Sequence, residues 1–170
     1  MKSTTYITFL LLFSVSCQAV DNYSVYLVRH AEKLTETKNP SLTDCGKTRA
    51  KQLANILSKA EITSLYSTSY QRTMQTAAPI AKQQQLTIKN YNPRHLEQFA
   101  LQLKTKQENA LVVGHSNTTP LLTALLAEQA VAPLTEYDFD FLYQVQFNQG
   151  KAILTVLQQP LKCQTLESKH

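Results

Sequence analysis

Two histidines stand where short apolar segments of the chain end. Residues 25–28 are followed by Arg29 and His30, and residues 110–113 are followed, after one glycine, by His115. Such runs are typical of buried strands, and open α/β sheets place functional groups at the carboxyl ends of their strands. A lone strand-end histidine is more often an ordinary polar residue. Two of them favour chemistry in which His30 is a nucleophile and Arg29 binds the anion that it attacks.

Arg72 is a third residue suited to the same anion. It lies between the two histidines in the sequence, and residues 62–67 before it are typical of another short strand. The pattern places Arg72 in the first turn of the following helix, beside backbone N–H groups that have no helical partner. This position favours phosphate binding. The alternative is an exposed arginine paired with a nearby acid.

Strand patterns alternate with helix patterns around these residues. Four short strands are expected at residues 25–28, 62–67, 86–89 and 110–113. Residues 139–147 then alternate between apolar and polar side chains, and a turn at 148–151 leads into residues 152–158, which predicts an antiparallel hairpin. The fold class is therefore α/β, with three layers (α/β/α) and a mostly parallel sheet that carries the hairpin at its margin.

Four helices are expected between the strands. Thr43 is typical of a helix cap, Pro79 should bend the second helix, Pro93 should open the third, and Thr119 with Pro120 should begin the fourth. The predicted buried faces, in chain order, are Ala50, Leu53, Ala54 and Leu57; Met74, Ala77, Ala78 and Ala81; Leu96, Phe99, Ala100 and Leu103; and Leu121, Leu122, Leu125 and Leu126.

The first residues have the features of an export signal. Lys2 precedes a short apolar core at residues 7–15, and Cys17-Gln18-Ala19 offers small residues at the positions that a signal peptidase reads. We expect residues 1–19 to be a signal peptide, cleaved after Ala19, which makes the protein periplasmic or secreted. The alternative is a lipoprotein, anchored by a lipid on Cys17. The apolar core is too short to span a membrane.

Composition narrows the classes of partner. The chain has 170 residues, of which 43% are hydrophobic and 17% are charged, and these values suit a single domain over residues 20–170. The formal net charge is +5, but the lysines are scattered and no basic run with interleaved aromatic residues occurs, so nucleic acid is not expected as a partner. The positive charge favours small anionic substrates, and it is equally compatible with simple solubility.

Two cysteines remain if Cys17 leaves with the signal peptide. Cys45 lies at the start of the first expected helix, and Cys163 lies in the C-terminal tail. An oxidising compartment would allow them to form a disulfide that ties the tail to the body of the protein. Two separate buried thiols are the alternative.

The ordered set of motifs resembles the histidine phosphatase superfamily, also called phosphoglycerate-mutase-like. The resemblance is carried by Val-Tyr-Leu-Val-Arg-His-Ala at 25–31, Tyr-Ser-Thr-Ser-Tyr-Gln-Arg-Thr-Met-Gln-Thr-Ala at 66–77 and Val-Gly-His-Ser at 113–116. It is similar to the branch that holds phosphoglycerate mutases and short phosphatases, because Ser116 stands where the acid phosphatase branch usually has aspartate.

The resemblance implies a role for each of four residues. His30 takes the phosphoryl group as a covalent phosphohistidine, while Arg29, Arg72 and His115 surround the transferred phosphate. Cationic and imidazole groups around the equatorial oxygens stabilise the charge that spreads over them in the transition state. No metal or other cofactor is then required, and the sequence has no carboxylate cluster suited to magnesium and no cysteine–histidine spacing suited to zinc.

The motifs identify the general acid and the substrate contacts less directly than they identify the four central residues. Relatives of this branch carry the acid between the positions of Arg72 and His115, where Glu97 is our choice, and a solvated glutamate near a helix start is its alternative. Glu32 is the reserve candidate. Lys33 and Asn117 are expected to touch substrate, or else to be an ordinary surface residue and helix-start residue.

The sequence favours hydrolysis over phosphate return. The stretch from Arg72 to Glu97 leaves no room for the large helical insertion that covers the pocket of true mutases, so water should reach the phosphohistidine. We expect a small extracytoplasmic phosphatase acting on a phosphorylated sugar, a cell-envelope component or a phosphoprotein. The alternatives are a phosphoglycerate mutase-like phosphotransferase and a non-catalytic protein that binds phosphorylated ligands.

Overall fold

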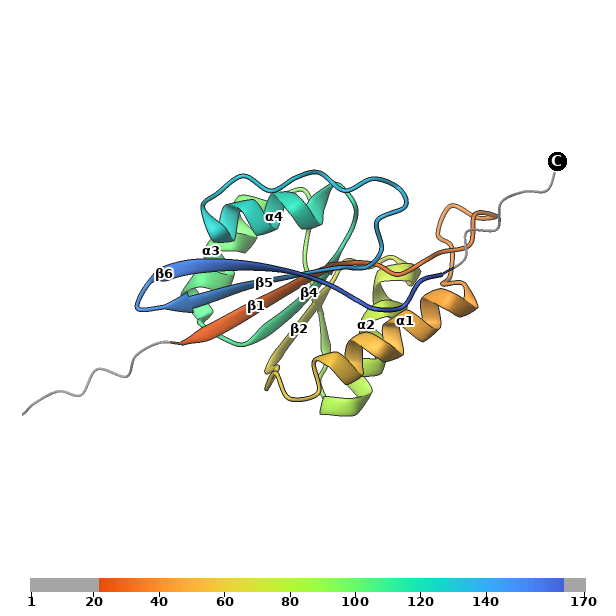
Figure 1. Ribbon diagram of the computed structural model, residues 1–170, viewed down its shortest axis with the longest axis horizontal. Coiled ribbons are helices and arrows are strands. Elements are labelled where there is room, and N and C mark those ends of the chain that lie inside the picture. The colour runs from red at the N-terminus through yellow and green to blue at the C-terminus, as the bar shows by residue number, and fades with distance from the viewer. Residues whose placement is uncertain (1–21, 164–170) are drawn as a thin grey trace, which may run out of the picture.

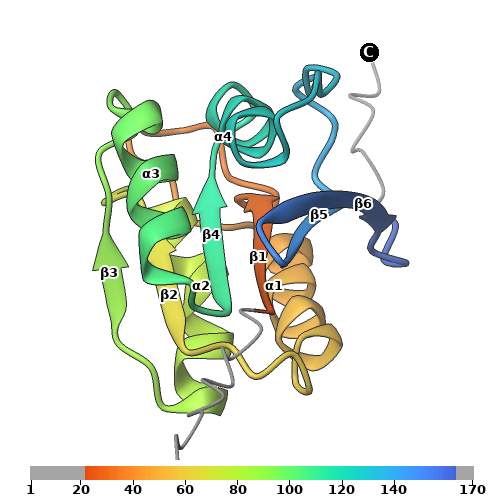
Figure 2. The ribbon, with the colours of Figure 1, turned by 90° about the vertical axis from the view of Figure 1, so that its left-hand side faces the viewer.

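Six strands form one mixed sheet in the structure, a computed structural model that describes residues 22–163. The strand order is β3-β2-β4-β1-β5-β6 (Figure 2). The strands are β1 (Tyr23–Arg29), β2 (Ser64–Ser67), β3 (Ile88–Asn90), β4 (Ala110–Gly114), β5 (Phe141–Asn148) and β6 (Lys151–Gln158). The first four pair in parallel, whereas β5 is antiparallel to β1 and to β6. This arrangement confirms the predicted α/β class with an antiparallel hairpin at the margin.

Four helices cover the two faces of the sheet. They are α1 (Asp44–Ile56), α2 (Gln71–Gln84), α3 (Leu96–Lys106) and α4 (Thr118–Ala127). Figures 1 and 2 show α1 and α2 on one face and α3 and α4 on the other. Each pair closes its own core, the first including Leu53, Leu65 and Ile80, and the second including Tyr66, Phe99 and Leu126. The three predicted layers are therefore present.

The start of α1 agrees with the sequence prediction, whereas the start of α3 differs from it because a turn precedes the helix. Thr43 caps α1 as predicted, since its hydroxyl accepts a hydrogen bond from the Gly46 N–H at 3.0 Å. Pro93 does not open α3, which begins at Leu96. The Asn92 side chain accepts from the Arg94 N–H at 3.0 Å, and this local turn delays the helix.

The buried faces of α2 and α4 include threonines that the apolar pattern did not indicate. In α2 the buried residues are Thr73, Thr76, Ala77 and Ile80, whereas Ala78 is exposed and Met74 is half-buried. In α4, Leu122 and Leu126 are buried with Thr119 and Thr123, and Leu121 is exposed. Threonine can lie in these cores because its hydroxyl donates to a backbone carbonyl, as Thr76 does to Arg72 at 2.7 Å.

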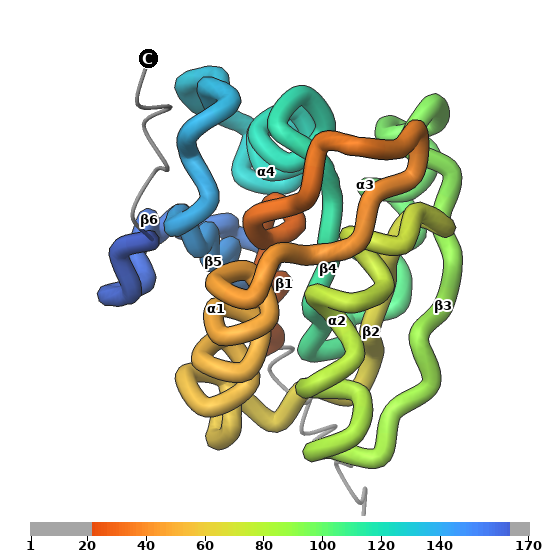
Figure 3. The backbone as a smooth tube through the Cα atoms, turned by 90° about the vertical axis from the view of Figure 1, so that its right-hand side faces the viewer, coloured from red at the N-terminus to blue at the C-terminus, as the bar shows by residue number. Residues whose placement is uncertain are grey.

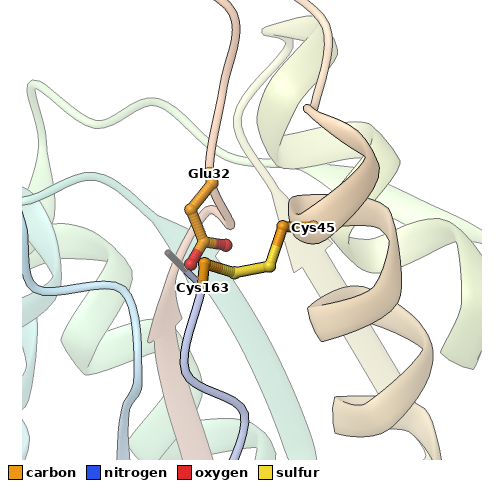
Figure 4. Close-up of side chains that lie close together, drawn as sticks. All are labelled: Glu32, Cys45 and Cys163. Carbon is orange, nitrogen blue, oxygen red and sulfur yellow. A yellow bond between two sulfur atoms is a disulfide. The ribbon is translucent and has the colours of Figure 1, made fainter. Parts of the chain in front are cut away.

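The C-terminal tail is fastened to the start of α1. Cys45 and Cys163 form a disulfide, which confirms the first of the two alternatives (Figure 4). Glu32 lies beside the two sulfurs and makes a largely buried, two-pronged ion pair with Arg49, with Oε1 and Nη2 2.6 Å apart. Gly46 permits this close packing, because a Cβ atom there would collide with the Glu32 carbonyl oxygen. The tail, α1 and the segment after β1 are thus joined at one place.

We expect the disulfide to contribute about 2–4 kcal/mol to the free energy of unfolding, since it closes a long loop in the unfolded chain. Urea unfolding of the oxidised protein and of the Cys45→Ser/Cys163→Ser double variant would measure the difference. Dithiothreitol should lower the stability of the wild-type protein by a similar amount and leave the double variant unchanged. Equal stability of the two oxidised proteins would contradict the expectation.

Some predictions concern residues outside this range. The signal peptide expected over residues 1–19, and the lipid site at Cys17, lie outside the described residues, so export stays a prediction. So does the extent of the single domain expected over residues 20–170. Between residues 22 and 163, no helix has the length and hydrophobicity that crossing a membrane demands.

Candidate active site

The two histidines meet because their strands are neighbours. β1 and β4 run in parallel with Arg29 opposite Gly114, and the His30 N–H donates to the Gly114 carbonyl oxygen at 2.9 Å. Both strands end at the same edge of the sheet (Figure 2). The rings of His30 and His115 lie edge to face with their centroids 5.6 Å apart. The predicted pairing of strand ends is therefore confirmed.

Gly114 lets β4 end among crowded side chains. A Cβ atom at this position would lie 2.8 Å from the Thr119 hydroxyl oxygen and 2.9 Å from that of Tyr91. The Thr119 hydroxyl also fixes the start of α4, because it donates to the Val28 carbonyl oxygen at 3.2 Å. The backbone that carries His115 is fixed by these neighbours.

His30 is poised as a neutral nucleophile. Its Nδ1 lies 2.8 Å from the Ala31 carbonyl oxygen, which can only accept, so Nδ1 carries the proton and Nε2 keeps a lone pair. Burial, with Arg29, Arg72 and His115 adding to it, lowers the pKa of His30 to about 3. The ring is therefore unprotonated at neutral pH and can attack an electrophilic phosphorus.

Arg29 is held from two sides and keeps one donor free. It is almost fully buried; Nη1 donates to the Thr135 carbonyl at 2.7 Å and Nη2 to Glu136 Oε2 at 2.9 Å. The Phe139 ring lies 4.1 Å from its Cζ atom. Its Nε is buried and has no hydrogen-bond partner in the described part of the chain.

Arg72 comes to the same cleft from the first turn of α2, as predicted. Its Cζ atom lies 4.5 Å from the centre of the Tyr70 ring, which orients the guanidinium group. Its Nε, like that of Arg29, is buried without a partner among residues 22–163. Buried donors are costly unless they bind something. Two guanidinium groups beside two imidazoles in one cleft are an arrangement suited to a tetrahedral anion.

His115 is also neutral and is tied to the strand beside it. Its Nε2 lies 3.0 Å from the Thr68 hydroxyl oxygen, and the Tyr70 ring packs against it edge to face at 5.2 Å. Burial, with the charges of Arg72 and Arg29 adding to it, lowers the pKa of His115 to about 4. The sequence left its charge open, and the structure makes it neutral when no anion is bound.

These groups line one cleft of about 390 Å³. The segment between β1 and α1 runs across this edge of the sheet (orange in Figure 3) and carries Lys33 to the cleft. The lining residues are Arg29, His30, Lys33, Tyr70, Arg72, Pro93, Arg94, His115, Ser116, Asn117, Thr118 and Glu136. The structure thus brings together six of the predicted site residues, the four central ones with Lys33 and Asn117.

The two predicted acids are not among them. Glu97 is exposed on α3 and lines a separate groove with residues of α4 such as Leu121 and Leu125, because the turn after β3 puts Pro93 and Arg94 at the cleft instead. Glu32 forms an ion pair with Arg49 and lies beside the disulfide (Figure 4). The structure therefore does not bring Glu97 or Glu32 to the cleft.

Sequence reasoning missed the carboxylate that does line the cleft. Glu136 comes from the connection between α4 and β5, where its oxygens accept from Arg29 and from the Ser116 hydroxyl at 3.1 Å. The nearby Arg29 guanidinium holds the pKa of Glu136 below its usual range. No sequence motif around Glu136 indicated a role at the site, because it reaches the cleft through a long connection without secondary structure.

One cluster of potential metal ligands occurs among the described residues, and it lies outside the cleft. It consists of Glu32, Cys45 and Cys163 (Figure 4). Both sulfurs are used in the disulfide and the carboxylate is used by Arg49, so these atoms are not available as thiolate and carboxylate ligands.

One family model matches part of the chain within this fold. Residues 25–93, which include Arg29, His30 and Arg72, match the model of the histidine phosphatase superfamily, branch 1. The segment that carries these three residues is similar to the histidine phosphatase superfamily. This similarity supports a phosphatase enzyme, and the position of His115 beside the matched residues agrees with the resemblance seen in the sequence.

Solved structures of histidine phosphatases share the fold. The α-ribazole phosphatase of Shigella flexneri has a TM-score of 0.65 and 17% identity, over 80% of this chain and 96% of that one. The protein histidine phosphatase SixA complexed with tungstate has a TM-score of 0.64 and 16% identity, over 79% of this chain and 96% of that one. A mycobacterial glucosyl-3-phosphoglycerate phosphatase has a TM-score of 0.61 and 11% identity, over 81% of this chain and 98% of that one. No curated protein matches the chain in sequence.

Replacing Glu97 with glutamine should leave turnover within about twofold of wild type, because an exposed residue outside the cleft does not touch the reacting atoms. Steady-state phosphate release by the two proteins would measure this. Glu136→Gln is the matched comparison, since its carboxylate contacts Arg29. A large loss of turnover in Glu97→Gln would restore the sequence hypothesis.

Proposed function

We propose that this protein hydrolyses phosphate monoesters through a phosphohistidine on His30, without a metal ion. The observation that carries the proposal is the convergence of a nucleophilic nitrogen and two guanidinium groups in one cleft. His30 Nε2 has its lone pair, and Arg29 and Arg72 line the same cleft. The phosphorus of a bound phosphate group is the electrophile for His30 Nε2. The oxygens of the same group accept hydrogen bonds from the two arginines.

The chemistry follows from charge. As the phosphoryl group moves from the ester oxygen to His30, negative charge spreads over its three equatorial oxygens. Arg29 and Arg72 are held in place by Thr135, Glu136, Phe139 and Tyr70 before any substrate arrives. Preorganised donors of this kind need no rearrangement during the reaction, and fixed guanidinium groups do here what a divalent cation does in other phosphoryl-transfer sites.

A small phosphorylated compound or a phosphorylated side chain of a protein is the substrate class that we propose. The cleft volume of about 390 Å³ suits one phosphate with a modest organic group. The proteins of similar fold are named for phosphatases of α-ribazole phosphate, glucosyl-3-phosphoglycerate and protein histidine. A sugar phosphate, a cell-envelope component and a phosphoprotein therefore remain the substrates to test. With export by residues 1–19, the substrate would lie outside the cytoplasm.

The proposal predicts phosphate release from p-nitrophenyl phosphate in the presence of a chelator. Rapid quenching with radiolabelled substrate should trap a phosphoenzyme that is stable in base and labile in acid, as a phosphorus–nitrogen bond requires, and peptide mapping should place the label on His30. A non-catalytic binding protein would bind phosphate and release none. A phosphotransferase would return the label to an added acceptor alcohol faster than to water.

A further inference from the structure

The cleft contains no carboxylic acid that can protonate a leaving group. Among the described residues that line it, Glu136 is the only carboxylate. Its two oxygens are occupied by Arg29 at 2.9 Å and by the Ser116 hydroxyl at 3.1 Å, and the Arg29 charge keeps it ionised. An alkoxide leaving group nevertheless needs a proton as its bond to phosphorus breaks. Another group must supply it.

The hydrogen bonds behind His115 fix which ring nitrogen is free. The Thr73 hydroxyl lies 2.9 Å from both the Thr68 and the Tyr70 carbonyl oxygens, which can only accept, so Thr73 donates to one of them. Thr68 then donates its hydroxyl proton to Thr73 Oγ1 at 2.9 Å and offers a lone pair to His115 Nε2 at 3.0 Å. His115 Nε2 therefore carries a proton.

His115 Nδ1 is consequently the nitrogen left for the cleft. Thr68 is buried and does not line the cleft, whereas His115 does. In the neutral ring, Nδ1 holds a lone pair that would face the oxygens of a bound phosphate, which are also acceptors. Two acceptors repel each other, and a proton between them removes the repulsion. Phosphate binding and protonation of Nδ1 should therefore favour each other.

The charges around His115 support this coupling. Arg29 from β1 and Arg72 from α2 are the cations that act on it, and with burial they keep its pKa low in the free protein. The other titratable groups close to the ring are His30 and Tyr70, and Glu136 is reached through Ser116. A phosphate dianion bound to the two arginines offsets their charge, which raises the pKa of the imidazole beside it.

We propose that His115 is the general acid of the reaction, taking up a proton at Nδ1 when the substrate binds and passing it to the leaving oxygen. The proposal rests on the phosphatase function proposed above. His30 Nε2 forms a bond to phosphorus while the ester P–O bond breaks, and the electron pair of that bond takes the Nδ1 proton to give an alcohol. Water then attacks the phosphohistidine, neutral His115 accepts its proton, and the P–N electron pair returns to His30.

Sulfate binding tests the proton uptake separately from turnover. Sulfate is fully ionised at neutral pH, so protons taken up with it come to the protein. Calorimetric titrations at one pH, in buffers with different ionisation enthalpies, should give an uptake approaching one proton per sulfate in wild type and none in His115→Gln. The matched control His95→Gln replaces an exposed histidine outside the cleft and should behave as wild type. No uptake in wild type, or equal uptake in His115→Gln, overturns the proposal.

The leaving group provides a second test that does not need the variant to bind sulfate. Nitrophenolate leaves without a proton, whereas an alkoxide needs one. His115→Gln should therefore lose about 10²–10⁴-fold in kcat on an alkyl phosphate and markedly less on p-nitrophenyl phosphate. Equal losses on both substrates would show that His115 only binds phosphate. If wild type hydrolyses neither substrate, the phosphatase function itself fails, and the sulfate titration still reports on the proton.

Discussion

Replacing His30 with asparagine should lower kcat for p-nitrophenyl phosphate by about 10⁴-fold or more, because it removes the atom that forms the covalent intermediate. Asparagine keeps a polar group near the Ala31 carbonyl oxygen, which accepts from His30 in the native protein. The trapped phosphoenzyme should disappear together with turnover. Stopped assays at high enzyme concentration would measure the residual rate.

Binding separates this effect from a loss of structure. The His30→Asn variant retains Arg29, Arg72 and His115, so it should still bind inorganic phosphate. An unchanged circular dichroism spectrum and urea midpoint would show that the fold is intact. Turnover within tenfold of wild type would mean that another group is the nucleophile.

Replacing Arg72 with glutamine should lower kcat/KM by about 10²–10³-fold, since one preorganised donor to the transferred phosphate is lost. Arg72 has an unpaired Nε and rests on Tyr70, and it makes no ion pair among the described residues. Stability should therefore change by less than about 0.5 kcal/mol. Steady-state kinetics and urea unfolding of the same preparation would measure both quantities.

Two further variants make the Arg72 prediction specific. Arg72→Lys keeps the charge and loses the planar fork, so it should recover part of the lost rate. Lys82→Gln removes an exposed positive charge from the same helix, away from the cleft, and should leave kcat/KM unchanged. If Lys82→Gln reduced the rate as much as Arg72→Gln, general electrostatic attraction would explain both results.

The central residues could be predicted because the signals that place them are local. A short apolar run that stops at Arg29 and His30, and another that stops before His115, each reveal where a strand ends. Parallel neighbours then bring those ends to one edge. Arg72 follows the same logic, because a helix first turn can be recognised from the residues around it.

The other features of the site and of the cores depend on contacts between distant residues, which a local sequence pattern does not indicate. Glu136 reaches Arg29 across 107 positions of sequence, through a connection with neither strand nor helix. Glu97 lies outside the cleft, and the turn at Asn92 that delays the start of α3 could not be recognised from the sequence pattern. Buried threonines in α2 were invisible to an apolar pattern, since their place in the core depends on hydroxyl partners within the folded chain.

The link between Cys45 and Cys163 has a consequence for limited proteolysis. The exposed connection between α4 and β5 lies inside the 118-residue span that the disulfide closes. A protease that cuts there would leave two fragments covalently attached, with Arg29, His30, Arg72 and His115 all on the larger one. The nicked protein should run as a single band on a gel until a thiol reagent is added, and only then separate into two.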